Sequence, residues 1–401
     1  MLRGKICQTT LGQCQVNSLE MKNHVLGSPP VQKNELSDST VKVAIIGRIP
    51  PPYGGVGVHL LRFLSEMRRA KLPFTFLDLD GNKDASNSIE ALPMNWLFIS
   101  RLLRLPYEVL HFHTSRVPQL LVLLLVLRFR PHIRVIITLH NQTPMLFYTK
   151  TSTLFKRVFN WFFKRADHII ATNKCIGEWA TNKLGLNSRQ VDVIPAYLPP
   201  SNEELQYNGF PQVIQSFFES HHPVIGSQGY YGNFMDGEHV YRFEELANLL
   251  SKLKKHYPNI GCYTAISGCY SENHRAKIRA LRDELDLGQH WMLQEEPFPA
   301  VPLYTRCDLF LRPTVTDGDS VSIRECLSIG TPVLASDAVS RPPGATTYPQ
   351  HDADKLYQLS RNLLDVTTND FPSATTSGQT NNDKLSDSAA KIVNIYRAAC
   401  S

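Results

Sequence analysis

Short apolar stretches alternate with amphipathic ones in two long series, and this alternation constrains the fold of the 401-residue chain more than any other feature. The first series predicts strands at residues 41–46, 74–79, 109–112, 135–139, 168–171 and 191–194. The second predicts strands from 224 onward and near 261–267, 291–294, 309–311 and 333–335. Strands that alternate with helices form parallel sheets covered by helices on both faces. We therefore predict an α/β chain with two doubly wound domains.

Breaks in the alternation give the expected domain boundaries. The pattern is absent at the start of the chain, lapses in a stretch that contains several prolines, and later gives way to a segment rich in Thr, Ser, Asn and Asp. Such polar segments are typical of disordered tails and linkers. The predicted organisation is a disordered extension at 1–40, a first domain at 41–205, a second at 222–365, a polar linker at 366–385 and a docking helix at 386–401.

Charge and cysteine usage narrow the location and the partners. A net charge of +6 suits attraction to anionic substrates or lipid headgroups, but it falls short of the charge expected of a nucleic-acid-binding protein. The eight cysteines include no C-x-x-C pair, which favours free thiols in a reducing compartment. The N-terminus carries no charged-then-apolar signal pattern. We expect a cytoplasmic protein that binds no nucleic acid.

An unbroken run of eight apolar residues, Leu120–Leu127, lies between Arg116 and Arg128. Spanning a bilayer takes about twenty apolar residues, so this run is too short to cross one. We expect it to be a buried helix of the first domain. The alternative is a helix at the membrane interface with the flanking arginines on lipid headgroups, which would make the protein peripheral at the inner face of the membrane.

Glycines cluster directly after the first predicted strand, at Gly54, Gly55 and Gly57, ahead of a helix expected from His59. The amides of such a loop can approach a diphosphate closely, and the helix dipole favours its negative charge. The alternative is a tight turn that needs positive φ. The cluster lacks the G-x-G-x-x-G spacing and an acidic residue about twenty positions on, which argues against a dinucleotide-binding dehydrogenase.

Three histidines stand at or near predicted strand ends. His140 follows one strand directly, where it can contact a substrate hydroxyl or oppose developing charge, although a lone histidine can also be structural. His111 and His113 share another predicted strand. We expect these two to face opposite sides of that strand and to act as packing residues.

One stretch of the second series reads as a strand, an acidic glycine turn, a short helix and a second strand, with Ser320 as the expected N-cap. The helix should bury one face and turn Glu325 the other way. Free amides near Ser320 and Val321 would lie between Asp317 and Glu325, ready for a phosphate. One alternative is that Asp317 and Asp319 only cap the helix and Glu325 is solvated. Another is that Asp317 and Asp319 form a D-x-D metal motif. Two doubly wound domains disfavour that motif.

Three motifs together resemble the family-4 glycosyltransferases of the GT-B fold. They are the loop P-P-Y-G-G-V-G-V-H after the first strand, the strand end T-L-H at 138–140, and Asp317 eight residues before Glu325, followed by G-T-P-V-L-A-S-D. The last motif is similar to the family's E-x7-E, with aspartate in the first place. The resemblance covers about residues 41–365.

The resemblance implies two Rossmann-like domains that face a central cleft, with a C-terminal helix that crosses back to the first domain. It implies a retaining transferase that takes a sugar from a UDP- or GDP-linked donor. The acceptor would be a glycan or a lipid-linked molecule in surface polysaccharide biosynthesis. No metal and no further cofactor would be needed.

Carried onto this sequence, the resemblance implies a role for each matching residue. His140 would contact the donor sugar and support the transition state, and Asp317 would hold sugar hydroxyls. These two are the expected catalytic residues. Glu325 would hold the nucleotide ribose, and amides would hold the diphosphate. The residues expected to bind the donor in this way are Gly54, Gly55, Ser320, Val321 and Glu325.

The sequence departs from the family at one place. Many relatives carry an Arg and a Lys just after the first strand of the second domain, and this chain has neither there before Arg242. Amides of a glycine loop expected at this place, with Gly229 among them, and another cation would have to replace them. The alternatives are a catalytically impaired sugar-nucleotide-binding protein, or an epimerase or phosphorylase on the same architecture.

Overall fold

The computed structural model describes residues 42–50, 55–85, 88–93, 98–113, 117–296, 298–317, 319–369 and 385–400. These residues form two compact units. The N-terminal unit takes the described residues up to Leu198 together with the last helix, α15 (Asp387–Cys400), and the C-terminal unit begins at Pro199. The extension expected at 1–40 lies outside the described residues, as does the expected linker from 370 to 384.

A parallel sheet of seven strands forms the centre of the N-terminal unit, in the order β3-β2-β1-β4-β5-β6-β7. Every residue of β1 and β4 is buried, because helices cover both faces of the sheet. The strands are β1 (Val43–Gly47), β2 (Phe74–Asp78), β3 (Ile89–Ala91), β4 (Val109–His113), β5 (Arg134–Leu139), β6 (His168–Ala171) and β7 (Val191–Val193). The helices are α2 (Gly55–Arg69), α3 (Phe98–Arg104), α4 (Val117–Leu127), α5 (Thr143–Thr149), α6 (Thr153–Phe163) and α7 (Lys174–Asn182), with a 3-10 turn at Ser188–Gln190.

A parallel sheet of six strands forms the centre of the C-terminal unit, in the order β12-β11-β8-β13-β14-β15. The strands are β8 (Val224–Tyr231), β11 (Gly261–Cys269), β12 (Trp291–Gln294), β13 (Leu309–Arg312), β14 (Val333–Ser336) and β15 (Thr346–Tyr348), with a small hairpin of β9 (Phe234–Met235) and β10 (Glu238–His239). The helices are α8 (Asn202–Leu205), α9 (Gln212–Ser220), α10 (Phe243–Leu253), α11 (Glu272–Glu284), α12 (Val301–Tyr304), α13 (Val321–Ser328) and α14 (Ala353–Asn369).

The predicted α/β fold with two Rossmann-like domains is confirmed by these two sheets. In each sheet the strand order reverses once along the sequence, between β1 and β4 in the N-terminal unit and between β8 and β13 in the C-terminal unit. Ligands of doubly wound sheets bind beyond the carboxyl ends of the strands at such reversals. The two reversals therefore mark where a site should lie in each unit.

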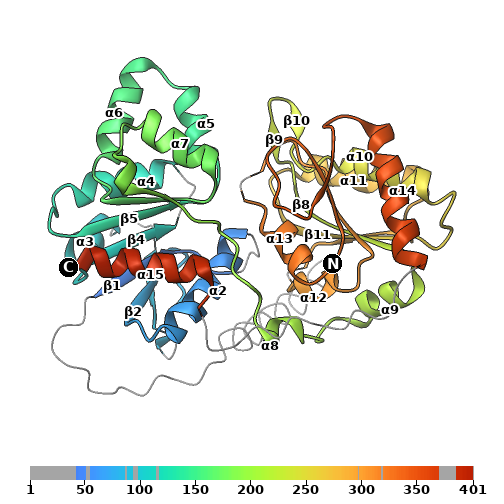
Figure 1. Ribbon diagram of the computed structural model, residues 1–401, viewed down its shortest axis with the longest axis horizontal. Helices are drawn as coiled ribbons and strands as arrows, with labels where there is room; N and C mark the ends of the chain where they lie inside the picture. Colours follow the sequence, from blue (N-terminus) through green and yellow to red (C-terminus); the bar gives the residue numbers. More distant parts are fainter. Residues whose placement is uncertain are drawn as a thin grey trace, which may run out of the picture. The chain divides into compact units, whose positions relative to one another are not determined.

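The last helix returns to the N-terminal unit, as the sequence predicts. α15 packs against α2 and β4, and Figure 1 shows it beside the first sheet. The amide of Ser386 donates to Oε2 of Glu66 at 2.8 Å, and the hydroxyl of Ser388 donates to the carbonyl of Pro195 at 3.1 Å. Tyr396 is 1% exposed against the same unit. An apolar helix face with a few fixed polar contacts thus holds the end of the chain to its first half.

The apolar run at 120–127 lies in α4, and most of its side chains are buried, which confirms the expected buried helix. None of the helices within the described ranges has the length and apolarity to cross a bilayer. α14 extends to Asn369, through residues 366–369 of the segment expected to be a linker. The sequence gives no prediction of β3, β15 or the β9–β10 hairpin, since two or three residues are too few to show a period.

Candidate functional site

Three histidines of the N-terminal unit meet near the carboxyl ends of β4 and β5. His59 comes from α2, His113 is the last residue of β4, and His140 follows β5 directly. The three can bring one nitrogen each within 4.8 Å of the others, and all three are buried. The sheet order explains the meeting, because β4 and β5 are neighbours whose carboxyl ends share one edge. We call these residues the histidine cluster.

Hydrogen bonds set the protonation of one ring of the histidine cluster. Nδ1 of His59 lies 2.6 Å from the carbonyl oxygen of Ala196, so it carries the proton and Nε2 keeps a lone pair. Nδ1 of His113 lies 2.9 Å from Nε2 of His140, so one of these two nitrogens donates to the other. Among the described residues, nothing bonds to the buried Nε2 atoms of His59 and His113. The lone pair of His59 is therefore available to a ligand.

His111 lies beside the cluster, and the expectation that it faces the opposite side from His113 is wrong. The two ring centroids are 4.1 Å apart. Successive residues of a strand alternate between its faces, so residues two apart share a face. Nε2 of His111 lies 2.7 Å from Oγ1 of Thr138, and Nδ1 lies 2.5 Å from the hydroxyl of Tyr396. His111 thus connects the histidine cluster to α15 through hydrogen bonds, whereas the sequence predicted only a packing role for it.

Burial keeps these histidines uncharged near neutral pH. It lowers the pKa of His59 to about 4, with the bond to Ala196 acting in the opposite direction and the charge of Arg62 adding to the decrease. Burial, and then the neighbouring histidines, lowers the pKa of His113 and His140 well below the ordinary value. A neutral imidazole can donate or accept a hydrogen bond or bind a metal, but it supplies no fixed positive charge.

Each unit contains a set of residues that could hold a metal ion. The histidine cluster offers three neutral imidazoles, which suit zinc and similar transition metals. In the C-terminal unit, His239, Glu244 and His274 also bring their ligand atoms within 4.8 Å. There the amide of Gly232 donates to Nδ1 of His274 at 3.1 Å, so the proton of the neutral ring sits on Nε2. That nitrogen cannot bind a metal while protonated, so the histidine cluster is the better candidate.

Of the two glycines expected to bind diphosphate, Gly54 lies outside the described residues and Gly55 is the exposed first residue of α2. The helix expected from His59 therefore starts one turn earlier. A Cβ at Gly55 would meet nothing within 4 Å. No neighbouring atom is close enough to require a glycine at this position. A ligand that approaches the backbone closely would be a reason for it.

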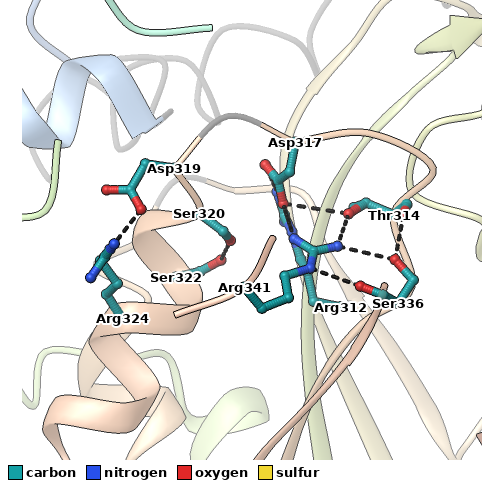
Figure 2. Close-up of polar contacts among 9 residues, drawn as sticks. All are labelled: Arg312, Thr314, Asp317, Asp319, Ser320, Ser322, Arg324, Ser336 and Arg341. Atoms are coloured by element: carbon teal, nitrogen blue, oxygen red, sulfur yellow. Dashed lines mark hydrogen bonds and ion pairs between the residues drawn. The ribbon is translucent and has the colours of Figure 1, made fainter. Parts of the chain in front are cut away.

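The C-terminal unit gathers charged residues at the carboxyl end of β13. Arg312, the last residue of the strand, donates from Nε to Oδ2 of Asp317 at 3.0 Å and from Nη2 to Oδ1 at 3.2 Å. Figure 2 shows Arg341 at the same carboxylate, with Nη1 3.0 Å from Oδ2. We call Arg312, Asp317 and Arg341 the arginine–aspartate cluster.

Arg341 also joins the ends of two strands. Its Nη2 donates to the hydroxyls of Thr314 and Ser336, each at 3.0 Å, and its Nε donates to the carbonyl of Ser336 at 2.8 Å. Thr314 follows β13 and Ser336 ends β14. Asp317 accepts a further bond from Thr314 at 3.4 Å. The carboxylate is therefore the anchor of a closed polar network, in addition to whatever it does to a substrate.

Two guanidinium groups against one carboxylate leave the arginine–aspartate cluster with an excess positive charge. Burial alone would raise the pKa of Asp317, but Arg312 and Arg341 outweigh it and hold that pKa below the ordinary value. Nη1 of Arg312 is buried and has no hydrogen-bond partner among the described residues. A buried guanidinium donor of this kind is costly unless a ligand or water uses it. The cluster is thus suited to an anion.

α13 begins four residues after Asp317. Ser320 is its N-cap, as expected, but the side chain makes no capping hydrogen bond and lies 3.4 Å from the hydroxyl of Ser322. The N-cap side chain therefore leaves the first amides of the helix, beginning at Val321, without the partner it would usually provide. Amides at a helix N-terminus bind phosphate and other anions. Asp319 points away to Arg324, with Oδ1 2.6 Å from its Nε (Figure 2).

Glu325 lies inside the C-terminal unit, and the expectation that it occupies an open face of α13 is wrong. It is 5% exposed, comparable with its buried neighbours Ile323 and Cys326. Helical spacing alone led to that expectation, and it does not show that α12 also packs against α13. Burial is the largest cause of the raised pKa of Tyr304 in α12, and the charge of Glu325 adds to it. The carboxylate is therefore close to α12.

Gly229 lies inside a strand, and the glycine loop expected at this place is wrong. β8 continues to Tyr231 and pairs Gly229 with Ile266 of β11. A Cβ at Gly229 would come within 2.6 Å of the ring of Phe243 and 2.9 Å of the ring of Tyr241. The glycine is required by the close approach of two aromatic rings. It cannot contribute to the site as part of a phosphate-binding loop.

The sequence prediction of the site missed both arginines and two of the three clustered histidines. Arg312 carries a signal that could have been used, since a charged residue closes the apolar strand L-F-L-R. Arg341 carries none, because it lies 24 residues from Asp317. His59 lies on a helix and gave no local sign of its partners.

Residues 53–197 match the family model of Glycosyltransferase Family 4. No curated protein matches the chain. Among solved structures, a glycosyltransferase from Rickettsia africae has a TM-score of 0.68 and 14% identity, and the match covers 90% of this chain and 99% of that one.

Two further structures have the same fold. HepE from Anabaena, in complex with UDP and glucose, has a TM-score of 0.65 and 14% identity, and the match covers 89% of this chain and 100% of that one. WaaG, a glycosyltransferase involved in lipopolysaccharide biosynthesis, has a TM-score of 0.61 and 12% identity, with 88% and 99% covered. The family match lies in the N-terminal unit, and the likeness of fold extends through both units. These findings show that the chain has the GT-B fold of solved glycosyltransferases and that its residues 53–197 are similar to Glycosyltransferase Family 4.

Proposed function

We propose that this protein is a retaining glycosyltransferase that moves a hexose from a UDP- or GDP-linked donor to a glycan or lipid-linked acceptor in surface polysaccharide biosynthesis. The observation that carries the proposal is the arginine–aspartate cluster. It follows β13, at the strand reversal of its sheet, and combines excess positive charge with an unused donor on Arg312. A nucleotide diphosphate is an anion that suits such a site.

Arg312 and the first amides of α13 would hold the diphosphate, so Arg312 takes the place of the cations that this chain lacks after β8. As the bond between the sugar and the diphosphate breaks, negative charge grows on the leaving diphosphate. A guanidinium that is already fixed by Asp317 stabilises that charge without having to reorganise. This is the step in which the cluster would contribute most to the rate.

The other expected residues keep their proposed roles. Glu325 holds the nucleotide ribose, and Asp317 contacts sugar hydroxyls while it anchors the two arginines. His140, a neutral ring, contacts the donor sugar through a hydrogen bond. Gly54 and Gly55 belong to the diphosphate and acceptor side.

The similar proteins support the class of donor and the pathway. HepE has been solved with UDP and with UDP-glucose, which supports a UDP-linked donor. WaaG takes part in lipopolysaccharide biosynthesis, which supports a surface glycan as the product. We further propose that the protein acts in the cytoplasm, where nucleotide sugars are the available donors.

We propose that the transfer needs no metal, because fixed guanidinium groups supply the positive charge that a divalent cation supplies in other transferases. Activity should survive chelation by EDTA. A loss that zinc alone restores would overturn this part of the proposal and would implicate the histidine cluster.

The test of the donor class is a thermal-shift series with UDP, GDP, ADP and NADH on the full chain. We expect UDP or GDP to raise the melting temperature and NADH to leave it unchanged. Transfer or slow hydrolysis of the matching sugar nucleotide should then be detected by the release of nucleoside diphosphate. If none of the diphosphates shifts the melting temperature, the proposal is wrong.

A second candidate is a sugar-nucleotide-binding protein without transferase activity. The engagement of Asp317 by two arginines favours it, since a carboxylate with several partners has less capacity for sugar hydroxyls. Binding of UDP or GDP without any turnover across a broad panel of acceptors would support this candidate over the first.

A further inference from the structure

We propose that α3, α4 and α6 form a membrane-docking face of the N-terminal unit, and that its partner is a bilayer surface rich in anionic lipids. The inference goes beyond the proposed transfer reaction, because it concerns where the protein is held and requires no nucleotide. Large apolar side chains of all three helices are exposed.

Each of the three helices exposes large apolar side chains at helical spacing. Steps of three, four and seven residues place such side chains on one face of a helix. They are Ile99 and Leu103 in α3, Val122 and Leu125 in α4 with Phe129 just after it, and Leu154, Val158 and Trp161 in α6. Phe129 and Leu154 are the most exposed of these side chains, at 75% and 73%.

The opposite faces of the same helices are well packed. Phe98 and Leu102 of α3, and Phe159 and Phe163 of α6, are buried in the core of the N-terminal unit. The exposed apolar side chains of these helices are therefore not part of the core. Exposed apolar residues that gather on neighbouring elements mark a surface of interaction.

The exposed apolar faces of the three helices belong to one surface, because α4 packs against both α3 and α6. Two arginines on either side of Phe129 connect the helices. The guanidinium of Arg128 lies 4.0 Å from the ring centroid of Trp161 in α6, and its Nη1 donates to the carbonyl of Trp161 at 3.3 Å. Nη2 of Arg130 donates to the carbonyl of Leu105, just after α3, at 3.2 Å. Phe129 thus lies between the ends of the other two helices.

Charge identifies the partner. Residues 98–164 contain ten Lys and Arg and a single acidic residue, Glu108, a net charge of +9. The whole chain carries +6, so all other residues together carry −3. The exposed cations of this region are Arg101, Arg104, Arg134, Lys150, Arg157 and Lys164, and Arg134 forms an ion pair with Asp167. The positive charge of the protein is therefore concentrated on the part of the chain that also exposes its apolar side chains.

An anionic bilayer accommodates both features at once. Apolar side chains enter the boundary between headgroups and acyl chains, and Lys and Arg extend their charged ends to the phosphates. Tryptophan prefers the same boundary, which suits Trp161 beneath Arg128. A neutral protein surface would cover the exposed apolar side chains but would bring no negative charge to the surrounding cations. The geometry thus favours a lipid surface over a protein partner.

The experiment is co-flotation of the full chain with vesicles of phosphatidylcholine alone or with about one third phosphatidylglycerol. We expect binding to the anionic vesicles, a partition coefficient at least tenfold lower on the neutral ones, and release at high salt. The patch variant is Phe129→Ser with Leu154→Ser. Its matched control is Val213→Ser with Phe234→Ser, which are 65% and 52% exposed on the C-terminal unit.

We expect the patch variant to bind anionic vesicles at least tenfold more weakly than the wild type, and the control to bind as the wild type does. Arg157→Glu with Lys164→Glu should weaken binding similarly, whereas Lys252→Glu with Lys255→Glu should not. All variants should keep the melting temperature and the nucleotide response of the wild type, so a failure of this inference is separate from a failure of the proposed function.

Three results would overturn the inference. One is absence of wild-type binding to anionic vesicles. Another is equal binding by patch and control variants. The third is a wild-type dimer in light scattering that the patch variant converts to a monomer while neither binds vesicles, which would make this face an interface between two copies of the chain.

Discussion

The carboxylate of Asp317 and the guanidinium of Arg312 form a two-pronged ion pair, 3.0 and 3.2 Å long, at the carboxyl end of β13. The two side chains are 11% and 8% exposed. A buried ion pair is stabilising only where further hydrogen bonds compensate the loss of water, and here Arg341 and Thr314 provide them. The loop that leads into α13, and with it the amides proposed to bind the donor, therefore depends on this pair.

Asp317→Asn should destabilise the C-terminal unit by about 3–5 kcal/mol, because it leaves two buried guanidinium groups without their counter-charge. Urea unfolding of the full chain, followed by tryptophan fluorescence, measures the change. Glu272→Gln is the control in the same unit, since Glu272 pairs with Arg275 at the surface and its side chain is 74% exposed. We expect a loss of about 1 kcal/mol or less there. Equal losses in the two variants would contradict the anchoring role of Asp317.

Arg312→Lys should weaken UDP binding about tenfold and leave uridine binding unchanged, because a lysine cannot keep the fork to Asp317 and also reach a phosphate. Calorimetric titrations with UDP, UMP and uridine give the comparison. Arg324→Lys serves as the control on α13 and should not alter the ratio of the UDP and uridine affinities. A matching loss of uridine affinity in Arg312→Lys would show that the variant damages the fold, not the contact with phosphate.

Glu325→Ala and His140→Ala should separate binding from turnover. Loss of hydrogen bonds from a charged carboxylate to a ribose should weaken nucleotide binding about ten- to a hundredfold. Loss of a contact that matters chiefly in the transition state should slow turnover about 10²- to 10³-fold, with binding largely retained. Affinity by calorimetry and kcat by release of nucleoside diphosphate test the division. The proposed division of roles is wrong if both variants lose nucleotide binding equally.

The stability of the N-terminal unit should fall as the pH is lowered from 7.5 to 5. Burial depresses the pKa of His59 to about 4 from an ordinary 6.5, so below pH 6.5 the unfolded chain takes up protons that the folded chain does not. Stability is therefore complete above pH 6.5 and is lost as the pH falls toward 4, by about 2 kcal/mol at pH 5 for this residue.

His59→Asn tests the pH effect, because the amide can still donate to Ala196 but does not titrate. Urea unfolding at the two pH values should show a smaller decrease for this variant than for the wild type. His132 is an exposed histidine of the same unit. The free energy of unfolding of His132→Asn should decrease between the two pH values as much as that of the wild type. An unchanged slope in His59→Asn would exclude His59 as the source.

Gly229→Ala and Gly55→Ala should have opposite effects on stability. A methyl group at Gly229 would meet the rings of Phe243 and Tyr241 at 2.6–2.9 Å, and such overpacking costs about 1–3 kcal/mol. At Gly55 the methyl group has open space at the start of a helix, so stability should be unchanged or higher by up to about 1 kcal/mol. If Gly55 approaches the donor, Gly55→Ala should nevertheless lose activity. Retained activity would remove Gly55 from the proposed site.

Much of the fold was predictable because helices and strands follow from local patterns in the sequence. β6 and β12 lie at the residues expected of them, and the last helix docks with Tyr396 buried, since strand and helix periods need only neighbouring residues. The expectations that failed concern what surrounds an element. Gly229 was expected in a loop because the rings that crowd it come from residues 241 and 243, beyond the strand. Glu325 was expected to face outward because the packing of α12 on α13 has no local signature.

Local sequence patterns are enough to predict two doubly wound domains, a C-terminal helix and a short set of candidate residues: His140, Asp317 and the start of α13. The tertiary structure sets which side chains these residues meet. Sheet order brings His59 and His113 to His140, and the loop after β14 brings Arg341 to Asp317 across 24 residues. It also decided which apolar side chains of α3, α4 and α6 stay outside. Backbone preferences act between neighbours along the chain, whereas contacts and exposure depend on how distant segments are packed.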